Sequence, residues 1–145
     1  MHMAAAVGDV VNIRRMVAEG ADVNVQGHQG ARPLHMAAAN GHVDAVRVLV
    51  EVGAEVEAAA VNGSTPLHSA ALNGHLAVVK TLVLELGADK EAATADGSRP
   101  LQIAAFRGRV AVVKALVELG ADKEASVRMD GHRCTLRRGR AMCQW

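Results

Sequence analysis

Three sequence features return along this 145-residue chain at a single spacing. Glycines stand at positions 8, 41, 74 and 108, prolines at 33, 66 and 100, and Gly-Ala pairs begin at 20, 53, 87 and 120. Each series therefore has a period of 33 or 34 residues. A period of this length is typical of solenoids, whose units bury their apolar faces only against neighbouring units. We expect a stack of such units and not a domain with one central core.

The local signals within one unit predict two helices and a loop. Thr65-Pro66 is a good helix start, because proline suits the first helical turn. Asn73-Gly74 stops that short helix, since glycine accepts a left-handed conformation. A second helix follows, with apolar residues on one stripe at Leu76, Val79, Leu82 and Val83. The polar stretch from Gly87 to Gly97 then predicts a projecting hairpin.

These residues resemble the ankyrin repeat, whose units carry the motifs T-P-L-H, A-A and G-H, a Val- and Leu-rich helix and G-A-D. The clearest copy runs from Gly63 to His75 as G-S-T-P-L-H-S-A-A-L-N-G-H. The resemblance covers roughly residues 1–125 and implies an all-α solenoid of stacked helix-turn-helix units joined by short β-hairpin-like loops. We expect an array over 1–126, with units at about 1–26, 27–59, 60–93 and 94–126, called the first to fourth units below. Aromatic residues make up only 1% of the chain, which suits a stack whose alanine pairs let helices approach closely.

The chain departs from the ankyrin pattern in three places. The first unit lacks its hairpin and helix start, because Met1 and His2 stand where Leu-His would. In the fourth unit, Gln102 replaces the histidine of T-P-L-H. The third unit holds one extra residue near Leu84, which should lengthen or bulge the last turn of its second helix.

Residues 127–145 form a degenerate basic tail, which we expect to be partly ordered or disordered. Residues 126–145 have a net charge of +4, so residues 1–125 carry −3 of the formal total of +1. The tail holds Cys134 and Cys143, whose spacing matches no usual zinc site, and we therefore expect a reducing, intracellular and cytoplasmic location. The positive charge comes from Arg128, Arg133, Arg137, Arg138 and Arg140.

The genetic code offers an explanation of this tail as a shifted reading frame. When the third base of each codon is joined to the next two bases, Met129-Asp130 gives a glycine codon and Met142-Cys143 a valine codon. If the arginines use CGN codons, the hidden frame permits G-W-T-P-L-H-x-A-A-x-x-G-H-V in register with the earlier units. We infer that one nucleotide is missing near codons 125–128, relative to an ancestral fifth repeat. The arginines, both cysteines and Trp145 would then never have been selected as a site.

Sequence motifs of catalysis and metal binding are missing. The chain has no G-x-G-x-x-G, P-loop, H-E-x-x-H or EF-hand motif. The repeated histidines, such as His35 and His68, invite a metal interpretation, but the resemblance implies that they hydrogen-bond loop backbones. We expect no enzymatic activity, no metal, no cofactor and no small-molecule substrate. No apolar run approaches the 18 residues of a spanning helix, so we expect no membrane partner.

The resemblance implies binding residues at the hairpin tips and at the exposed end of each inner helix. Leu72 and Phe106 are large and apolar where the family has small residues, and with Arg107 they form the expected hot spot. The alternative to a binding role is that Leu72 and Phe106 are ordinary exposed apolar side chains, or that they pack between neighbouring units. The expected partner-binding residues are His28, Gln29, Asn40, Asn62, Leu72, Asn73, Asp96, Phe106 and Arg107.

Charged residues also recur on the units. Acidic residues at the hairpin bases either attract a basic partner or brace the loops, and we favour bracing. On the outer helices, Arg47–Glu51 and Lys114–Glu118 are expected i,i+4 ion pairs. The acidic row consists of Asp22, Glu55, Glu57, Asp89, Glu91, Asp122 and Glu124.

The sequence favours a non-catalytic module that binds a protein or peptide through its hairpin tips and concave face. The alternative is a binder of nucleic acid or anionic surfaces through the arginine-rich tail, and we consider nucleic acid the weaker hypothesis. Both end units lack a polar cap, so we also expect weak self-association through them.

Overall fold

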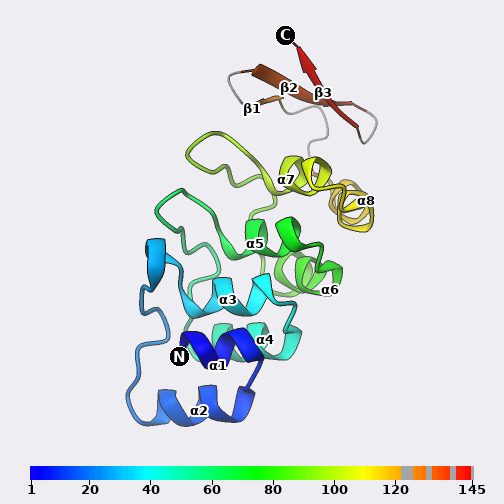
Figure 1. Cartoon of the computed structure of the whole chain (residues 1–145). Helices are drawn as coiled ribbons and strands as arrows, with labels where there is room; N and C mark the ends of the chain where they lie inside the picture. Colours follow the sequence, from blue (N-terminus) through cyan, green and yellow to red (C-terminus); the bar gives the residue numbers. More distant parts are fainter. Residues whose placement is uncertain (122–125, 130–131, 138–139, 145) are drawn as a thin grey trace.

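A computed structural model of the chain describes residues 1–121, 126–129, 132–137 and 140–144. Pairs of antiparallel helices stack side by side along one axis, and the loops between units project to one side (Figure 1). Inner helices α1, α3, α5 and α7 contact one another in order, as do outer helices α2, α4, α6 and α8. The bounds are α1 (His2–Val7), α2 (Val10–Ala18), the 3-10 turn η1 (His28–Gly30), α3 (Pro33–Ala39), α4 (Val43–Glu51), α5 (Pro66–Asn73), α6 (Leu76–Lys80), η2 (Thr81–Glu85), α7 (Pro100–Phe106) and α8 (Val110–Glu118).

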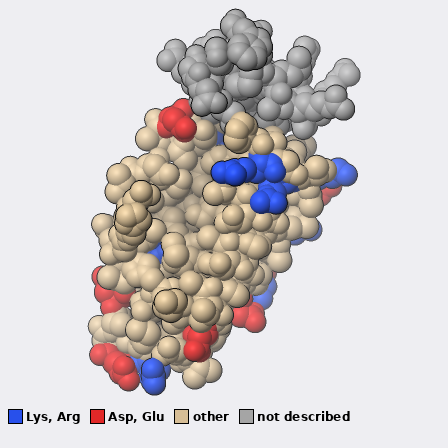
Figure 2. Space-filling model, viewed as in Figure 1, with Lys and Arg blue, Asp and Glu red and all other residues tan. Residues whose placement is uncertain are grey.

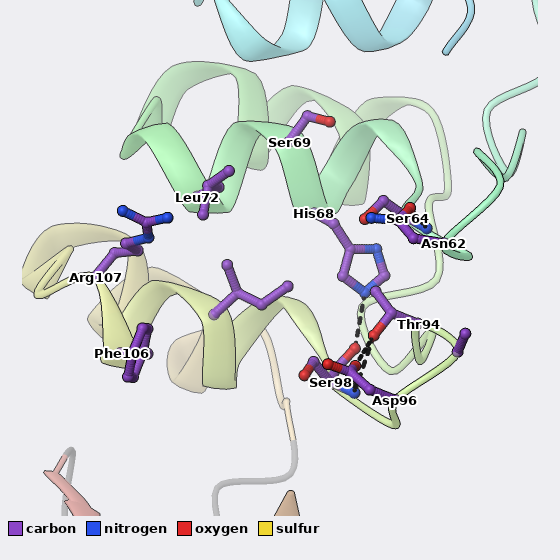
Figure 3. A pocket seen from close by; sticks show the side chains of 12 residues that line it. Asn62, Ser64, His68, Ser69, Leu72, Thr94, Asp96, Ser98, Phe106 and Arg107 are labelled. Atoms are coloured by element: carbon purple, nitrogen blue, oxygen red, sulfur yellow. Dashed lines mark hydrogen bonds between the residues drawn. The ribbon is translucent and has the colours of Figure 1, made fainter. Parts of the chain in front are cut away.

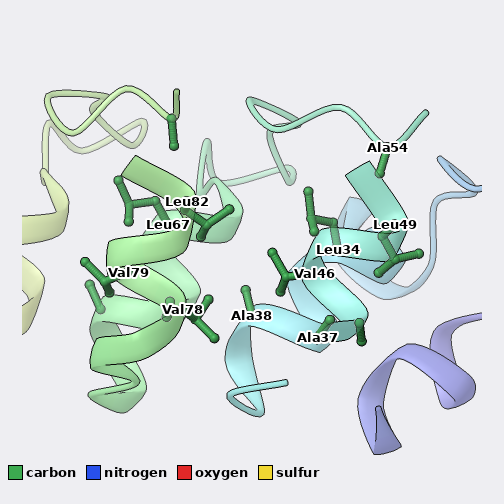
Figure 4. Packing of buried hydrophobic residues seen from close by; sticks show 14 of the residues in the cluster. Leu34, Ala37, Ala38, Val46, Leu49, Ala54, Leu67, Val78, Val79 and Leu82 are labelled. Atoms are coloured by element: carbon green, nitrogen blue, oxygen red, sulfur yellow. The ribbon is translucent and has the colours of Figure 1, made fainter. Parts of the chain in front are cut away.

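Alanine pairs on the inner helices explain how the stack closes without aromatic residues. Ala37, Ala38, Ala70 and Ala71 are each 0% exposed, and their small side chains let α3 and α5 approach closely. Leucines and valines from the outer helices fill the space behind them (Figure 4). The core is therefore a thin layer repeated between units, as the sequence predicts.

The hairpin-like loops and the helix starts also form as expected. Each loop is closed by a backbone hydrogen bond, for example from Ala60 N to Ser64 O at 2.9 Å and from Thr94 N to Ser98 O at 2.9 Å. A proline begins each of the helices α3, α5 and α7, because its fixed φ suits the first turn and it has no N–H to leave unpaired.

The extra residue of the third unit is accommodated as a π-helical turn. In the other units a backbone bond joins residues five apart at the helix end, as in Ala54 N to Leu49 O at 2.8 Å. In the third unit the equivalent bond joins residues six apart, from Ala88 N to Leu82 O at 2.8 Å. The π-helical segment η2 lies directly before it, which confirms the predicted bulge near Leu84.

The predicted i,i+4 ion pairs are wrong, because the outer helices pair across units instead. Glu51 accepts from Arg14 of the preceding unit at 3.1 Å, and Arg47 reaches Glu85 of the following unit at 2.7 Å. No Lys114–Glu118 pair occurs among the described residues. Neighbouring outer helices lie close enough for long side chains to form ion pairs. Glu85, the partner of Arg47, is the last residue of the π-helical segment described above.

A three-stranded antiparallel sheet, in the order β1-β2-β3, follows the array within the described residues. The predicted ankyrin solenoid is confirmed for the array, but the sequence did not predict these strands in the tail. No helix in the described part of the chain is long and apolar enough to cross a membrane. The strands are β1 (Ser126–Met129), β2 (His132–Arg137) and β3 (Arg140–Gln144).

Candidate functional site

A cavity of about 490 Å³ opens between the third and fourth units, on the side where the hairpin loops project. Helices α5 and α7 form its floor and one end, and the two hairpin loops form the other end (Figure 3). The lining residues are Asn62, Ser64, His68, Ser69, Leu72, Thr94, Ala95, Asp96, Ser98, Ile103, Phe106 and Arg107.

Five of the nine expected binding residues lie together in this lining. The structure brings together residues from two hairpin tips and from the ends of two inner helices, although they are far apart in sequence. The five residues are Asn62, Leu72, Asp96, Phe106 and Arg107. His28, Gln29, Asn40 and Asn73 lie outside the cavity.

One end of the cavity is apolar and lies at the C-terminal ends of α5 and α7. Leu72 is partly buried, and Phe106 is 61% exposed, so the ring lies largely in water. Ile103 joins them, one turn before Phe106 on α7. Ile103 was not among the predicted binding residues, although the equivalent residues Met36 and Ser69 show that the framework does not require an isoleucine there.

The two ends of the cavity carry opposite charges. Arg107 is exposed, and its guanidinium has no ion-pair partner among the residues that the structure describes. At the other end, Asp96 accepts hydrogen bonds from the Thr94 hydroxyl and from Ser98 N, the latter at 3.1 Å. The Thr94 and Ser98 hydrogen bonds lower the pKa of the Asp96 carboxyl, so it stays ionised at neutral pH.

His68 lines the cavity close to its hairpin end (Figure 3). Its Nδ1 accepts from the backbone N–H of Thr65 at 3.1 Å, so its proton is on Nε2, which donates to Ser98 O at 3.1 Å. His35 repeats this arrangement one unit earlier, donating from Nε2 to Ser64 O at 2.9 Å. Burial lowers the pKa of both histidines, because the charged ring would lose its hydration. Both rings therefore join adjacent units as neutral hydrogen-bond donors.

A second series of side chains joins the units at the loop between the two helices. His75 Nε2 donates to Ala39 O at 2.9 Å, and at the equivalent place in the fourth unit Arg109 Nε donates to Leu72 O at 3.1 Å. Gly74 has φ 73°, and a Cβ there would lie 2.8 Å from the Arg109 side chain. The positive φ favours glycine at this position, and a larger residue would also displace the Arg109 side chain from its bond to Leu72 O. No group of metal-ligating residues is found in the described part of the chain.

The four expected residues outside the cavity take part in hydrogen bonds or lie at a hairpin tip. Asn73 Nδ2 donates to Ala39 O of the preceding unit at 3.0 Å, and Asn40 Nδ2 donates to Met36 O at 2.8 Å. Gln29 O accepts from Val61 N at 2.9 Å, which links two hairpin tips. His28 is exposed in η1.

The acidic residues at the hairpin bases brace the loops, as the favoured interpretation has it. Glu55 pairs with Arg32 and Glu91 with Arg99, each at 2.6 Å. Glu57 accepts from the backbone of the next hairpin, at Asp89 N, at 2.7 Å. Asp122 and Glu124 lie outside the described residues.

The tail arginines cannot be placed in a site in the same way. Arg138 lies outside the described residues, and the side chains of the other four, on β1, β2 and β3, lie outside the described part as well. On the face shown in Figure 2, basic side chains gather over α7, and acidic side chains lie at both ends of the array, with more of them at the end away from α7.

Comparison with protein families agrees with this architecture. A model of ankyrin repeats in three copies matches residues 1–94, and a single ankyrin repeat model matches residues 96–126. The chain belongs to the ankyrin repeat family. Ankyrin repeats are in general protein–protein interaction modules, and the family is generally a non-catalytic scaffold. A search of curated proteins found no match to the chain.

Proposed function

We propose that this ankyrin array binds a protein or peptide partner through the groove between its hairpin loops and inner helices, with Leu72, Phe106 and Arg107 as the main contacts. The observation that carries the proposal is the 61% exposure of Phe106 at a cavity, outside the buried core. Aromatic residues and arginine are enriched among the residues that dominate binding energy.

The polar residues around this apolar end form the rim of the proposed site. Asn62 and Asp96 are exposed at the tips of adjacent hairpins, and His28 and Gln29 extend the same row to the second unit. Asn40 and Asn73 lie at the ends of the inner helices beside it. Such a rim excludes water from the central contacts and contributes less to affinity.

A peptide-display selection against the immobilised full chain tests the proposal. Binders recovered with the wild type are measured by fluorescence anisotropy against the Phe106→Ala and Leu72→Ala variants. We expect each substitution to weaken binding by more than about 1 kcal/mol, which is about fivefold in Kd. The midpoint of urea unfolding should change little, because neither side chain belongs to the buried core.

Leu84→Ala is the matched control for this measurement. Leu84 is an apolar side chain of similar exposure, 66%, but it lies on η2 of an outer helix. Its truncation should leave Kd unchanged. Binders that are insensitive to Phe106 and Leu72, or a large loss of stability in those two variants, would contradict the proposed site.

A further inference from the structure

The cavity carries enough chemistry to specify its ligand. We infer that it takes one large apolar side chain of an extended peptide, and that the residue next to this side chain is acidic, with its carboxylate paired to Arg107. The inference rests on the proposed function and names the partner class for the same site.

The apolar part of the ligand follows from the floor of the cavity. Leu72 from α5 and Ile103 and Phe106 from α7 all line the cavity, and Figure 3 shows the Leu72 side chain facing α7. An aliphatic or aromatic side chain placed there would cover the exposed Phe106 ring and remove apolar surface from water. The volume of about 490 Å³ suits one large side chain with its backbone, and not a folded domain.

The acidic residue of the peptide is inferred from the partners of the arginines near the cavity. Arg32 and Arg99 are paired with Glu55 and Glu91, and Arg109 donates to Leu72 O. Arg107 lines the cavity and has no acidic partner in the described part of the chain. A carboxylate is the group that matches a guanidinium, because two parallel hydrogen bonds can form between them.

The negative charge of Asp96 determines on which side of the apolar side chain the acidic residue of the peptide can lie. Its carboxylate lies at the opposite end of the cavity from Arg107 (Figure 3) and is held ionised by donors from its own loop. An acidic peptide residue is repelled there and attracted at the Arg107 end. The acidic position of the peptide is therefore next to the apolar side chain on the side away from the hairpins.

We expect the peptide to be recognised by side chains and not by addition of a β-strand, because backbone groups at the hairpin tips are already hydrogen-bonded to each other. Asn62 O already accepts from Ala95 N at 2.9 Å, and Gln29 O accepts from Val61 N. These bonds join the hairpin tips to one another, so the backbone groups that carry them are not available to a peptide strand.

The test uses the full chain and fluorescein-labelled peptides chosen from a random library by selection on the wild type. We expect the binders to share a Phe, Trp, Leu or Ile next to an Asp or Glu. Arg107→Glu should weaken these peptides at least about tenfold, and replacing the acidic peptide residue with Lys should restore binding to that variant. Arg15→Glu, on the exposed face of α2, is the matched charge control and should change Kd little.

The outcomes separate this inference from the proposed function. Peptides that need Phe106 and Leu72, but show no acidic preference and tolerate Arg107→Glu, overturn the inference and leave the proposed function in place. Peptides that tolerate all three substitutions overturn both, and so does a selection that enriches no binder. Urea unfolding of each variant shows that the fold is retained.

Discussion

The second and fourth units have the same backbone plan but different side chains at the positions that join units and face the groove. In the second unit His42 donates across the unit boundary to Ala6 O at 3.0 Å. In the fourth unit Arg109 makes the equivalent bond, and Gln102 stands where the second unit has His35. The bond to the neighbouring backbone is retained although its donor changes, so the array requires a donor of suitable length and not a histidine.

At the end of the inner helix, where side chains face the groove, the two units differ in the size and charge of their residues. The second unit ends its inner helix with Ala39-Asn40, and the fourth ends with Phe106-Arg107. The backbone is unaffected, because these side chains point away from the core. The positions that join units therefore keep a hydrogen-bonding side chain, whereas the groove positions differ in size and charge, as expected if the proposed site determines specificity.

The two units also differ in their C-terminal neighbours, which leads to the largest expected effect. The second unit is covered by the third, but the fourth is followed by the β1-β2-β3 sheet. We propose that inserting one nucleotide near codons 125–128 restores a fifth repeat. The free energy of unfolding should then rise, because the hairpin and inner helix of a further unit would cover the fourth unit and form a new interface with it.

Urea unfolding and far-UV circular dichroism of the frame-restored protein measure this effect. Helical content and the m-value should both rise, since more surface is buried. Inserting the nucleotide after codon 143, with an in-frame stop codon kept at the original end of the chain in both genes, is the control, because it changes only the last two residues. A gene whose hidden frame does not encode T-P-L-H after the glycine-tryptophan pair would disprove the frameshift.

A matched pair of core substitutions probes the same difference in neighbours. Leu34 and Leu101 occupy equivalent positions and are 1% and 2% exposed. Leu34→Ala should cost about 2–5 kcal/mol in the free energy of unfolding, because it leaves a cavity inside the stack. Leu101→Ala should cost less in global unfolding, because an end unit can open locally before the rest. Urea denaturation compares the two variants, and equal losses would show that the fourth unit is as firmly held as the second.

The sequence predicted the array and five of the twelve residues that line the cavity, because both follow from the period. Once the units are in register, equivalent positions lie side by side, and Leu72 and Phe106 stand out against the small residues expected there, with Arg107 next to Phe106. The same logic located the π-helical turn at Leu84. These features depend only on the spacing of residues along the repeat, which can be read directly from the sequence.

The features that could not be predicted depend on distances between units. The pairing of Arg47 with Glu85 requires the lateral spacing of α4 and α6 and the geometry of η2. Comparison with Met36 and Ser69 marks Ile103 as an unusual residue at its position, but only the structure places it in the cavity lining beside Phe106. The strands of the tail follow no repeat, so the period says nothing about them.

Titration of the buried histidines gives a smaller effect. Burial lowers the pKa of His35 and His68 below the unfolded value of 6.5, so the unfolded chain binds more protons just below that pH. The free energy of unfolding should therefore fall as pH drops below 6.5, by at most about 1.4 kcal/mol per pH unit for each histidine. The stability is fully present above pH 6.5.

Replacing both histidines with glutamine should flatten this dependence. Gln102 shows that glutamine fits the position, since it is 1% exposed and its Oε1 accepts from Arg99 N at 2.8 Å. Chemical denaturation between pH 5 and pH 7.5 compares the double variant with the wild type. An unchanged slope in the double variant would mean that other groups cause the pH dependence.

The smallest expected effect concerns the exchange of donors at the loop between the helices. Arg109→His places in the fourth unit the residue that His42 and His75 provide elsewhere, and it should change the free energy of unfolding by less than about 0.5 kcal/mol. Arg109→Ala removes the donor to Leu72 O and should cost about 0.5–1.5 kcal/mol. Thermal or urea unfolding of the two variants measures both values. If histidine costs as much as alanine, the guanidinium itself is required, and the units are less interchangeable than their shared backbone suggests.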